Sequence, residues 1–294
     1  EDHIVEKISA VWSFFAILAF LISRTSVSEK IGKKIRRSYC KIETKEKFSS
    51  GRNADMIVAG KIRCVNCMKK MNIVRHRCLW CGFRQETYQP LPYHMNPGTV
   101  LANRYSIGRV MGEGNFGIVY LAWDMVLEQK TAIKEYFPKN AIRRDWIRGV
   151  DAHIKIENEK NFAAGKKQFE REAAYLSRFS RLDNVCRVVD YFNENDTAYI
   201  VTQYIEGMSL EKHMEKYGKF GEAQTVSLLL PLVRSLAEIH KTGLLHRDIN
   251  PSNIIYQEQK KLVLTDFGSM QMAGQKKSLQ TQCTAGYSPH EQYL

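Results

Sequence analysis

Short apolar runs alternate with isolated polar residues near the C-terminal end of the chain. The pairs 244–245 and 254–255 and the run 262–264 have the length of short buried strands. Two carboxylates and one amide lie between or directly after these runs: Asp248, Asn253 and Asp266. We therefore expect each of them at a strand edge or a turn, where its side chain can reach a ligand.

The middle of the chain carries both strand-like and helix-like patterns. Apolar alternation on either side of residues 112–117 predicts two strands joined by a glycine-rich hairpin, and further strands are expected at 131–134 and within 199–207. Helical spacing predicts α-helices at 169–176 and 222–241, with Phe169, Ala173 and Leu176 on one face of the first helix.

The N-terminal part has an uncharged apolar run at residues 8–23. At about 1.5 Å per residue it spans roughly 24 Å, slightly less than a hydrocarbon core of about 30 Å. We interpret residues 1–23 as a transmembrane segment; a buried helix or a signal-peptide core remains the alternative. The positive-inside rule places the basic linker at 24–61 in the cytoplasm. We therefore expect a membrane-associated protein with a cytoplasmic domain, the alternative being a wholly cytoplasmic one.

Composition adds little to this picture. A chain of 294 residues with 44% hydrophobic residues can hold two ordinary domains with packed cores. The formal net charge of +13 favours acidic partners such as phosphates or anionic lipid, although a solvated surface explains such a charge equally well. The basic linker is therefore expected either to contact anionic lipid or to remain a solvated connection.

Four cysteines form two C-x-x-C pairs separated by ten residues: Cys64, Cys67, Cys78 and Cys81. Paired thiolates at this spacing predict a structural Zn²⁺ site within residues 62–84. So short a module has almost no core, so the metal must supply the folding energy, typically about 10–16 kcal/mol. Two disulfides are the alternative, and a reducing cytoplasm argues against them. Nearby basic residues leave nucleic-acid binding as a weaker alternative, which we do not expect.

The prolines and glycines of residues 85–103 predict a linker. After it, Gly112, Gly114 and Gly117 form a G-x-G-x-x-G pattern. Glycines let a backbone approach phosphates with its N–H groups pointing at them. A dinucleotide site would need a helix directly after the glycines, whereas residues 118–123 are β-prone, so we favour a phosphate-covering hairpin.

The residues around the C-terminal apolar runs suit phosphoryl transfer. That reaction needs metal ions on the phosphates and a carboxylate near the attacking hydroxyl. Asp248 can accept the hydroxyl hydrogen bond, while Asn253 and Asp266 supply hard oxygen ligands for Mg²⁺. H-R-D or D-F-G alone indicates little, but their order and spacing, with an Asn five residues after the Asp, make a coincidence improbable.

With H-R-D-I-N-P-S-N, D-F-G and the glycine pattern, residues 104–292 resemble the eukaryotic-like serine/threonine protein kinases of bacteria. The two C-x-x-C pairs resemble the zinc ribbons that precede some of these kinase domains. The resemblance implies an α+β, protein-kinase-like two-lobe fold, with an N-lobe at 104–206 and a partial C-lobe at 207–294. It also implies ATP, Mg²⁺ or Mn²⁺, and protein substrates with Ser or Thr. We expect the chain to be a fragment that ends within its C-lobe.

The resemblance assigns roles to individual positions. Asp248 orients the substrate hydroxyl, Lys134 holds phosphate, and Glu172, rather than Glu170, holds Lys134. Thr202 corresponds to the residue that guards the back of the nucleotide pocket. Nucleotide contacts are implied for the following residues: Gly112, Gly114, Phe116, Gly117, Val119, Ala132, Lys134, Gln203, Ile205 and Ile255.

The segment after Gly268 resembles an activation segment. Ser278 and Thr281 are the expected phosphate acceptors, and Arg247 is the expected partner of that phosphate. The segment ends in a variant A-P-E motif, in which we assign the family's Glu to Glu291.

Asn250 departs from the family, which usually has Lys at this place. We expect its amide to donate to phosphate, which predicts a slow kinase whose rate rises in Asn250→Lys. Two alternatives remain: a pseudokinase that binds ATP as a scaffold, and a small-molecule phosphotransferase of the antibiotic type, which shares the H-x-D-x-x-x-x-N loop.

Overall fold

The computed structural model describes residues 61–72, 76–114, 116–139, 142–147, 151–156, 158–258, 260–274 and 284–293. The apolar run at 8–23, the basic linker up to residue 60, and the expected phosphate acceptors Ser278 and Thr281 lie outside these residues. Within the described ranges, no helix combines the length and apolar character needed to cross a membrane.

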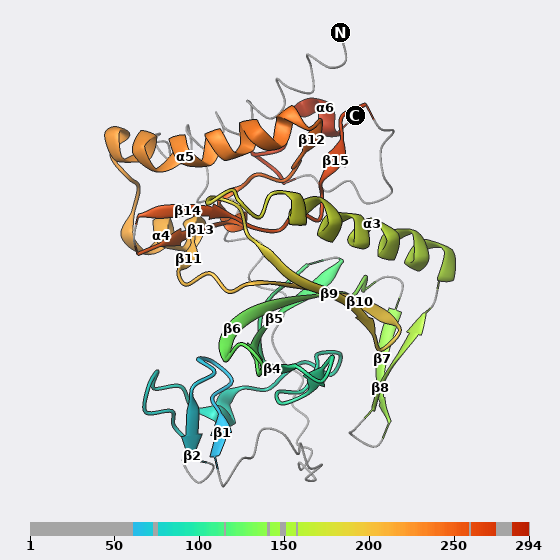
Figure 1. Cartoon of the computed structure of the whole chain (residues 1–294). Helices are drawn as coiled ribbons and strands as arrows, with labels where there is room; N and C mark the ends of the chain where they lie inside the picture. Colours follow the sequence, from blue (N-terminus) through green and yellow to red (C-terminus); the bar gives the residue numbers. More distant parts are fainter. Residues whose placement is uncertain are drawn as a thin grey trace.

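A six-stranded antiparallel sheet forms the middle layer of the molecule (Figure 1). In spatial order its strands are β3 (Val100–Leu101), β4 (Tyr105–Glu113), β5 (Gly117–Asp124), β6 (Gln129–Tyr136), β10 (Thr197–Gln203) and β9 (Val188–Glu194). β4 and β5 are the two strands that the glycine-rich pattern predicted. Large buried side chains, including Tyr105, Tyr120 and Tyr199, fill the core of this N-lobe.

Helix α3 (Glu159–Arg178) packs against this sheet. Asn158 caps it by accepting a hydrogen bond from the Asn161 N–H at 3.1 Å. Its buried face includes Phe169, Ala173 and Leu176, as the helical spacing predicted. The helix begins well before the predicted stretch, because its first turns present only Phe162 and Gly165 to the core and so carry a weak apolar signal.

A β-hairpin lies between β6 and α3, in a segment whose role the sequence pattern did not indicate. Its strands are β7 (Ile142–Ile147) and β8 (Asp151–Ile156). Arg144 of β7 reaches into the N-lobe core, where its guanidinium pairs with the buried carboxylate of Glu135. The hydroxyls of Tyr120 and Tyr199 donate to the same carboxylate, each at 3.1 Å. This shared acceptor attaches the hairpin to β5, β6 and β10.

The C-lobe carries helices α4 (Leu210–Tyr217) and α5 (Glu222–Lys241) and a short helix α6 (His290–Tyr293). Two small sheets lie beside α5: β11 (Met208–Ser209), β13 (Ile254–Gln257) and β14 (Lys261–Leu264), and β12 (Leu244–Leu245) with β15 (Gln271–Met272). A separate apolar cluster around Leu229, Leu236 and Leu264 forms the core of this lobe. The two lobes and their separate cores agree with the kinase-like fold expected from the motifs.

The cysteine-rich module contains β1 (Lys61–Arg63) and β2 (Lys70–Asn72), at the bottom of Figure 1, and is followed by the short 3-10 helix η1 (Gln85–Thr87). It docks directly on β4. The Arg109 N–H donates to the Val65 carbonyl at 3.1 Å, and Arg109 Nε donates to Asn66 Oδ1 at 2.6 Å. Met68 is fully buried against Gly108, where any Cβ would lie only 2.7 Å from the Met68 sulfur. Gly108 therefore permits this close contact.

Candidate active site

Two adjoining cavities lie between the lobes and share Lys134, Glu172 and Asp266 in their walls. The larger, of about 390 Å³, extends from the glycine-rich hairpin to Asn253 and Asp266. The smaller, of about 170 Å³, is mostly apolar, and its wall contains residues predicted to line the nucleotide pocket: Val119, Ala132, Thr202, Gln203, Ile205 and Ile255. A cleft with one polar and one apolar end suits a nucleotide.

Lys134 lies at the centre of this cleft. Its ammonium is 2.9 Å from Glu172 Oε1 and 2.7 Å from Asp266 Oδ1. Glu172 is buried on α3, whereas Glu170 points elsewhere and accepts a hydrogen bond from the Tyr191 hydroxyl at 2.9 Å. The structure therefore has the Lys134–Glu172 pair that the family pattern favoured.

The charges of Lys134 and Asp266 stabilise one another, whereas burial raises the pKa of Glu172 despite the nearby Lys134 ammonium. Burial works to lower the pKa of Lys134, but the carboxylates of Asp266 and Glu172 outweigh it and raise that pKa above its ordinary value. The Lys134 ammonium in turn lowers the pKa of Asp266. Both groups are consequently charged at neutral pH, as phosphate and metal binding require.

The glycine-rich hairpin is held by its own backbone, since the Gly114 N–H donates to the Gly117 carbonyl at 2.9 Å. A Cβ on Gly117 would lie 2.6 Å from the Glu135 carbonyl oxygen, so the packing of β5 on β6 requires glycine there. A Cβ on Gly112 or Gly114 would meet no atom within 4 Å. Packing does not explain these two glycines, whereas close approach of a phosphate does.

Asp248 receives three side-chain hydrogen bonds. Asn253 Nδ2 donates to its Oδ2 at 2.8 Å, and Asn250 Nδ2 donates to its Oδ1 at 2.9 Å. The hydroxyl of Thr284 also donates to Oδ1, at 2.6 Å. The Asp248 carboxylate therefore already binds a threonine hydroxyl, which is the contact proposed for a substrate. The sequence did not indicate the Thr284 contact, because these two residues are far apart in the chain.

Asn250 differs from its expected role. Its side chain is buried, and its amide N–H₂ is turned toward Asp248 rather than toward the cavity. Its Oδ1 accepts from the Ser252 N–H at 3.0 Å and the Asn253 N–H at 3.2 Å, which caps the short 3-10 helix η2 (Pro251–Asn253). Both ends of the amide are thus used within the loop, so the expected phosphate contact is not what the structure shows.

Asn253 and Asp266 fit the expected Mg²⁺ site. Both line the larger cavity. The Asn253 N–H₂ group is bonded to Asp248, so its oxygen is the atom that can face a metal. An amide oxygen and a charged carboxylate are the ligands that Mg²⁺ prefers.

Arg247, directly before Asp248 in the H-R-D motif, has a positive φ of 68°. Its guanidinium donates to Gln271, and its carbonyl accepts from Gln292 Nε2 at 2.8 Å. The phosphate partners expected for Arg247 lie outside the described residues, as does the side chain of Glu291.

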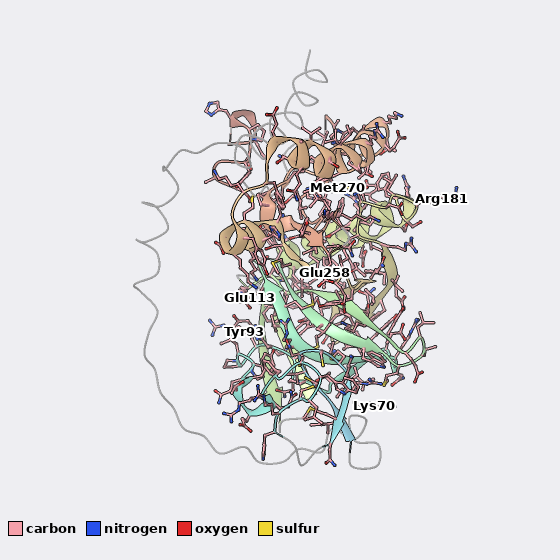
Figure 2. The ribbon with its side chains drawn as sticks, turned by 90° about the vertical axis from the view of Figure 1, so that its left-hand side faces the viewer. Lys70, Tyr93, Glu113, Arg181, Glu258 and Met270 are labelled. Carbon is pink, nitrogen blue, oxygen red and sulfur yellow. The ribbon has the colours of Figure 1, made fainter. Side chains whose placement is uncertain are left out.

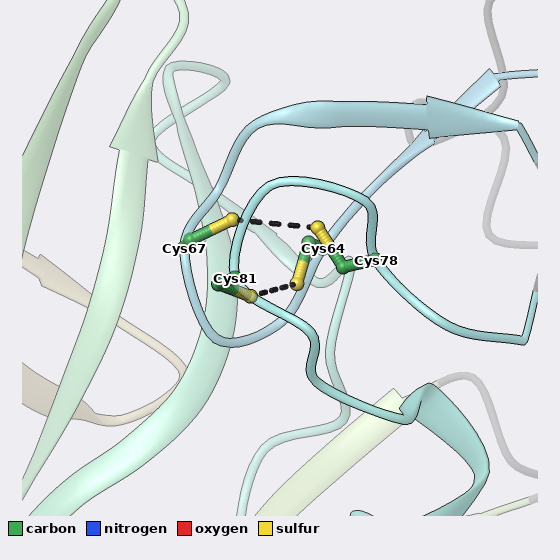
Figure 3. A group of neighbouring side chains, drawn as sticks. All are labelled: Cys64, Cys67, Cys78 and Cys81. Carbon is green, nitrogen blue, oxygen red and sulfur yellow. Dashed lines mark hydrogen bonds between the residues drawn. The ribbon is translucent and has the colours of Figure 1, made fainter.

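The four predicted zinc ligands converge in the cysteine-rich module (Figure 3). Their sulfurs all lie within 4.8 Å of one another, with 3.6 Å between Cys64 and Cys81 and 3.7 Å between Cys67 and Cys78. Tetrahedral Zn–S bonds of about 2.3 Å place sulfurs roughly 3.8 Å apart, so this set fits zinc. Gln85 Nε2 also donates to the Cys64 sulfur at 3.2 Å, as outer partners of metal ligands do.

The part of the chain that contains both lobes matches a known protein family. Residues 105–292 match the model of the protein kinase domain. Serine/threonine-protein kinase B of Synechocystis sp. is 30% identical over 226 residues, which cover 68% of this chain and 37% of that protein. Serine/threonine-protein kinase PrkC of Bacillus subtilis is 31% identical over 171 residues, covering 58% of this chain and 23% of that protein. The chain thus spans about a third or less of the length of these relatives.

A solved structure described as the PpkA-294 apo form is also similar. It is 39% identical, with a TM-score of 0.52, and the match covers 62% of each chain. This likeness extends the comparison from the sequence to the fold.

Proposed function

This chain belongs to the protein kinase family and carries a serine/threonine protein kinase domain, and we propose that it transfers the γ-phosphate of ATP to Ser and Thr hydroxyls of proteins. One observation carries the proposal. The Lys134 ammonium lies within 3 Å of both Glu172 and Asp266, in a cleft that the glycine-rich hairpin covers. This is the arrangement that phosphate positioning needs.

The residues of the cleft have separate roles in this reaction. Lys134, held by Glu172, binds phosphate oxygens, and the smaller apolar cavity takes the base. Asp248 accepts a hydrogen bond from the attacking hydroxyl and orients it, as it now does for Thr284. Mg²⁺, when held by Asn253 and Asp266, supplies positive charge that offsets the charge of the phosphates.

Two further parts of the proposal concern the N-terminal half. Zn²⁺ is proposed as a structural ion at the four cysteines, supported by their sulfur spacing. The apolar run at 8–23 and the basic residues after it support a membrane anchor with the kinase domain on the cytoplasmic side. Fractionation of cells tests the anchor: the full-length protein should sediment with membranes and leave them only with detergent, and recovery from the soluble fraction alone would exclude it.

Radiolabelled ATP tests the catalytic proposal. The full-length protein with Mg²⁺ or Mn²⁺ should phosphorylate itself or a generic protein substrate on Ser or Thr. Asp248→Asn should lower the rate by orders of magnitude and keep ATP binding near that of the parent. Asp183→Asn is a matched control, because Asp183 is 84% exposed.

The substitution at Asn250 favours a second candidate, a pseudokinase that binds ATP as a scaffold. A parent protein that binds ATP but phosphorylates neither itself nor a generic substrate would support that function instead. Phosphorylation of an aminoglycoside-type small molecule, with proteins left unmodified, would indicate a small-molecule phosphotransferase.

A further inference from the structure

The segment between the cysteine-rich module and β3, expected to be a linker, is folded against the N-lobe. We call residues 88–95 the strap. At its start, the Tyr88 hydroxyl accepts a hydrogen bond from the Val110 N–H of β4 at 2.8 Å. At its end, the Met95 N–H donates to the Tyr120 hydroxyl at 3.2 Å, and Met95 is buried. The strap therefore follows β4 toward the glycine-rich hairpin.

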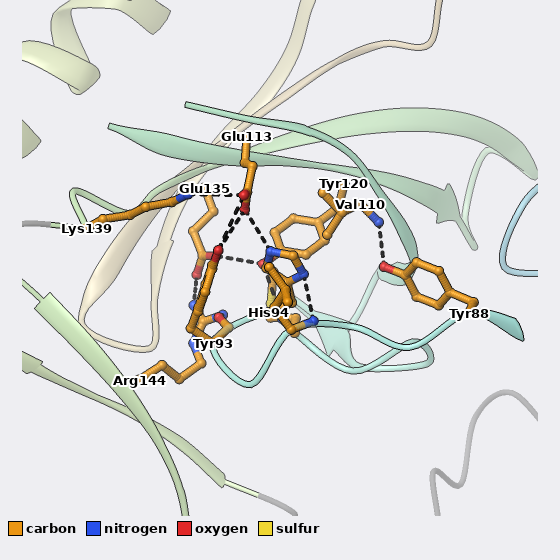
Figure 4. Close-up of polar contacts among 11 residues, drawn as sticks. Tyr88, Tyr93, His94, Val110, Glu113, Tyr120, Glu135, Lys139 and Arg144 are labelled. Atoms are coloured by element: carbon orange, nitrogen blue, oxygen red, sulfur yellow. Dashed lines mark hydrogen bonds and ion pairs between the residues drawn. The ribbon is translucent and has the colours of Figure 1, made fainter. Parts of the chain in front are cut away.

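The strap meets the hairpin at Glu113, between Gly112 and Gly114 (Figures 2 and 4). The Glu113 carboxylate lies 2.8 Å from His94 Nε2 and 3.2 Å from the Tyr93 hydroxyl. From the other side, Lys139 Nζ approaches it to 3.1 Å. Two segments distant in the sequence, the strap and the residues around Lys139, thus converge on one side chain of the hairpin.

The orientation of His94 is determined by its second nitrogen. The Leu91 N–H donates to His94 Nδ1 at 3.1 Å, so Nδ1 is an acceptor and Nε2 carries the hydrogen that is donated to Glu113. The imidazole is buried, with only 6% of its residue surface exposed. This geometry turns His94 into a fixed donor aimed at the hairpin.

Tyr93 is held in a similar way by the hairpin formed by β7 and β8. Arg144 Nη1 donates to the Tyr93 carbonyl at 2.8 Å, and the Tyr93 ring stacks on Phe137 with centroids 5.9 Å apart. Since Arg144 is itself held by buried Glu135, the strap is attached to the N-lobe core. Contacts outside the glycine-rich hairpin therefore hold both Tyr93 and His94 in place.

Besides the Gly114–Gly117 and Phe137–Phe116 backbone hydrogen bonds, the described part of the hairpin is held through the Glu113 side chain. Gly112 and Gly114 have no packing neighbour for a Cβ, and glycines lose much conformational freedom when they become ordered. Burial works to raise the pKa of Glu113, but hydrogen bonds from His94 and Lys139 lower it overall, so the carboxylate is charged. A free carboxylate at this place would repel the phosphates of a nucleotide.

We propose that the strap is a positioning device for the nucleotide site: Tyr93 and His94, together with Lys139, hold Glu113 and so order the glycine-rich hairpin before ATP binds. Ordering a loop in advance removes part of the entropic cost of binding. Holding the carboxylate in this network also neutralises its charge. Glu113, Tyr93 and His94 are positioning residues that act through the hairpin. The proposal rests on ATP being the ligand of the cleft.

The test measures ATP dissociation constants of the full-length protein by calorimetry, together with KM for ATP and kcat. His94→Ala should weaken ATP binding about tenfold, through loss of a hydrogen bond to a charged group, and raise KM while kcat at saturating ATP stays near the parent value. Tyr93→Phe, which keeps the stacked ring, should weaken binding less. His94→Gln, which can still donate to Glu113, should restore most of the affinity.

A double-mutant cycle separates positioning from general damage. If His94 acts through Glu113, adding His94→Ala to Glu113→Ala should change ATP affinity little further. The control is His76→Ala. This change removes an exposed contact in which His76 Nδ1 lies 3.0 Å from Glu86 Oε2, away from the glycine-rich hairpin. Equal ATP affinity in parent, His94→Ala and Tyr93→Phe would overturn the strap proposal, as would fully additive effects in the cycle. A parent that binds no ATP would instead overturn the proposed function.

Discussion

Asn250 donates an amide N–H to Asp248 Oδ1 at 2.9 Å. The position where the family usually has a lysine therefore holds the catalytic carboxylate in place. The same amide accepts from two backbone N–H groups of η2 through its oxygen. The residue links the conformation of the loop to the orientation of Asp248.

This relationship revises the prediction for position 250. Asn250→Ser should retain a cap for η2 but lose the donor to Asp248, so we expect a lower kcat with little change in melting temperature. Asn250→Lys loses the oxygen that caps η2, and we expect a stability loss of about 1 kcal/mol and no gain in rate. Steady-state kinetics and thermal unfolding of both variants check this. A faster Asn250→Lys enzyme would instead support the expectation that residue 250 contacts the phosphate of ATP.

Glu172 and Glu170 form a matched pair on α3. Glu172→Gln replaces the buried carboxylate that holds Lys134, so kcat/KM for phosphorylation should fall at least tenfold. Glu170→Gln should stay near the parent, because that side chain accepts a hydrogen bond from the Tyr191 hydroxyl and does not contact Lys134. Similar losses in both variants would show that helix stability, rather than the ion pair, is being measured.

Asp266→Asn should abolish Mg²⁺-dependent phosphorylation, because it removes the charged member of the expected metal site. Raising the Mg²⁺ concentration in the assay should not restore phosphorylation. The variant also frees Lys134 from one carboxylate 2.7 Å away, so ATP binding without metal should persist. Unchanged Mg²⁺ dependence would mean that another residue holds the metal.

The catalytic loop should make folding stability sensitive to mild acid. Burial lowers the pKa of His246 to about 4, below the ordinary value of about 6.5. Between about pH 6.5 and pH 4, His246 is therefore protonated in the unfolded chain but neutral in the folded protein. The contribution of neutral His246 to the free energy of unfolding is complete above about pH 6.5. It is lost as the pH falls toward 4, by about 3 kcal/mol in all.

Denaturant unfolding between pH 7 and pH 4 measures this loss. His246→Phe, which keeps a ring beside Phe267, should show a flatter dependence on pH than the parent. The Asp266 carboxylate, whose pKa is lowered by Lys134, loses its contribution only in more acidic solution, below about pH 4. Parallel pH profiles for parent and variant would contradict the assignment to His246.

The cysteine-rich module should bind one Zn²⁺ per chain. Elemental analysis of reduced protein should find stoichiometric zinc in the parent and in Cys186→Ser, whose thiol lies buried elsewhere. Cys78→Ser should lose the metal, and a chelator should unfold the module, because metal binding must supply its folding energy. A reduced parent protein without zinc would rule out the site.

The local spacing of residues determined a large part of this protein. The C-x-x-C pairs, the glycine pattern, H-R-D with its Asn, and D-F-G lie on short stretches whose geometry depends on near neighbours. For that reason the sulfur cluster and the glycine-rich hairpin occur where the sequence predicted them, while the Lys134–Glu172 pair followed from the family resemblance. The resemblance to the kinase family chose Glu172 over Glu170, and in the structure Glu172 is buried on the same helix as Phe169 and Leu176.

Tertiary structure decided the contacts between distant segments. Thr284 on Asp248, Arg144 beside Glu135, and His94 with Lys139 on Glu113 join residues that no periodicity relates. The proline-rich composition of 85–103 predicted a linker, but the surface of β4 and the buried ring of His94 fold part of it into the strap. Asn250 shows the same limit at short range: its residue type permits a phosphate contact, but the backbone of its loop offers the amide nearer partners.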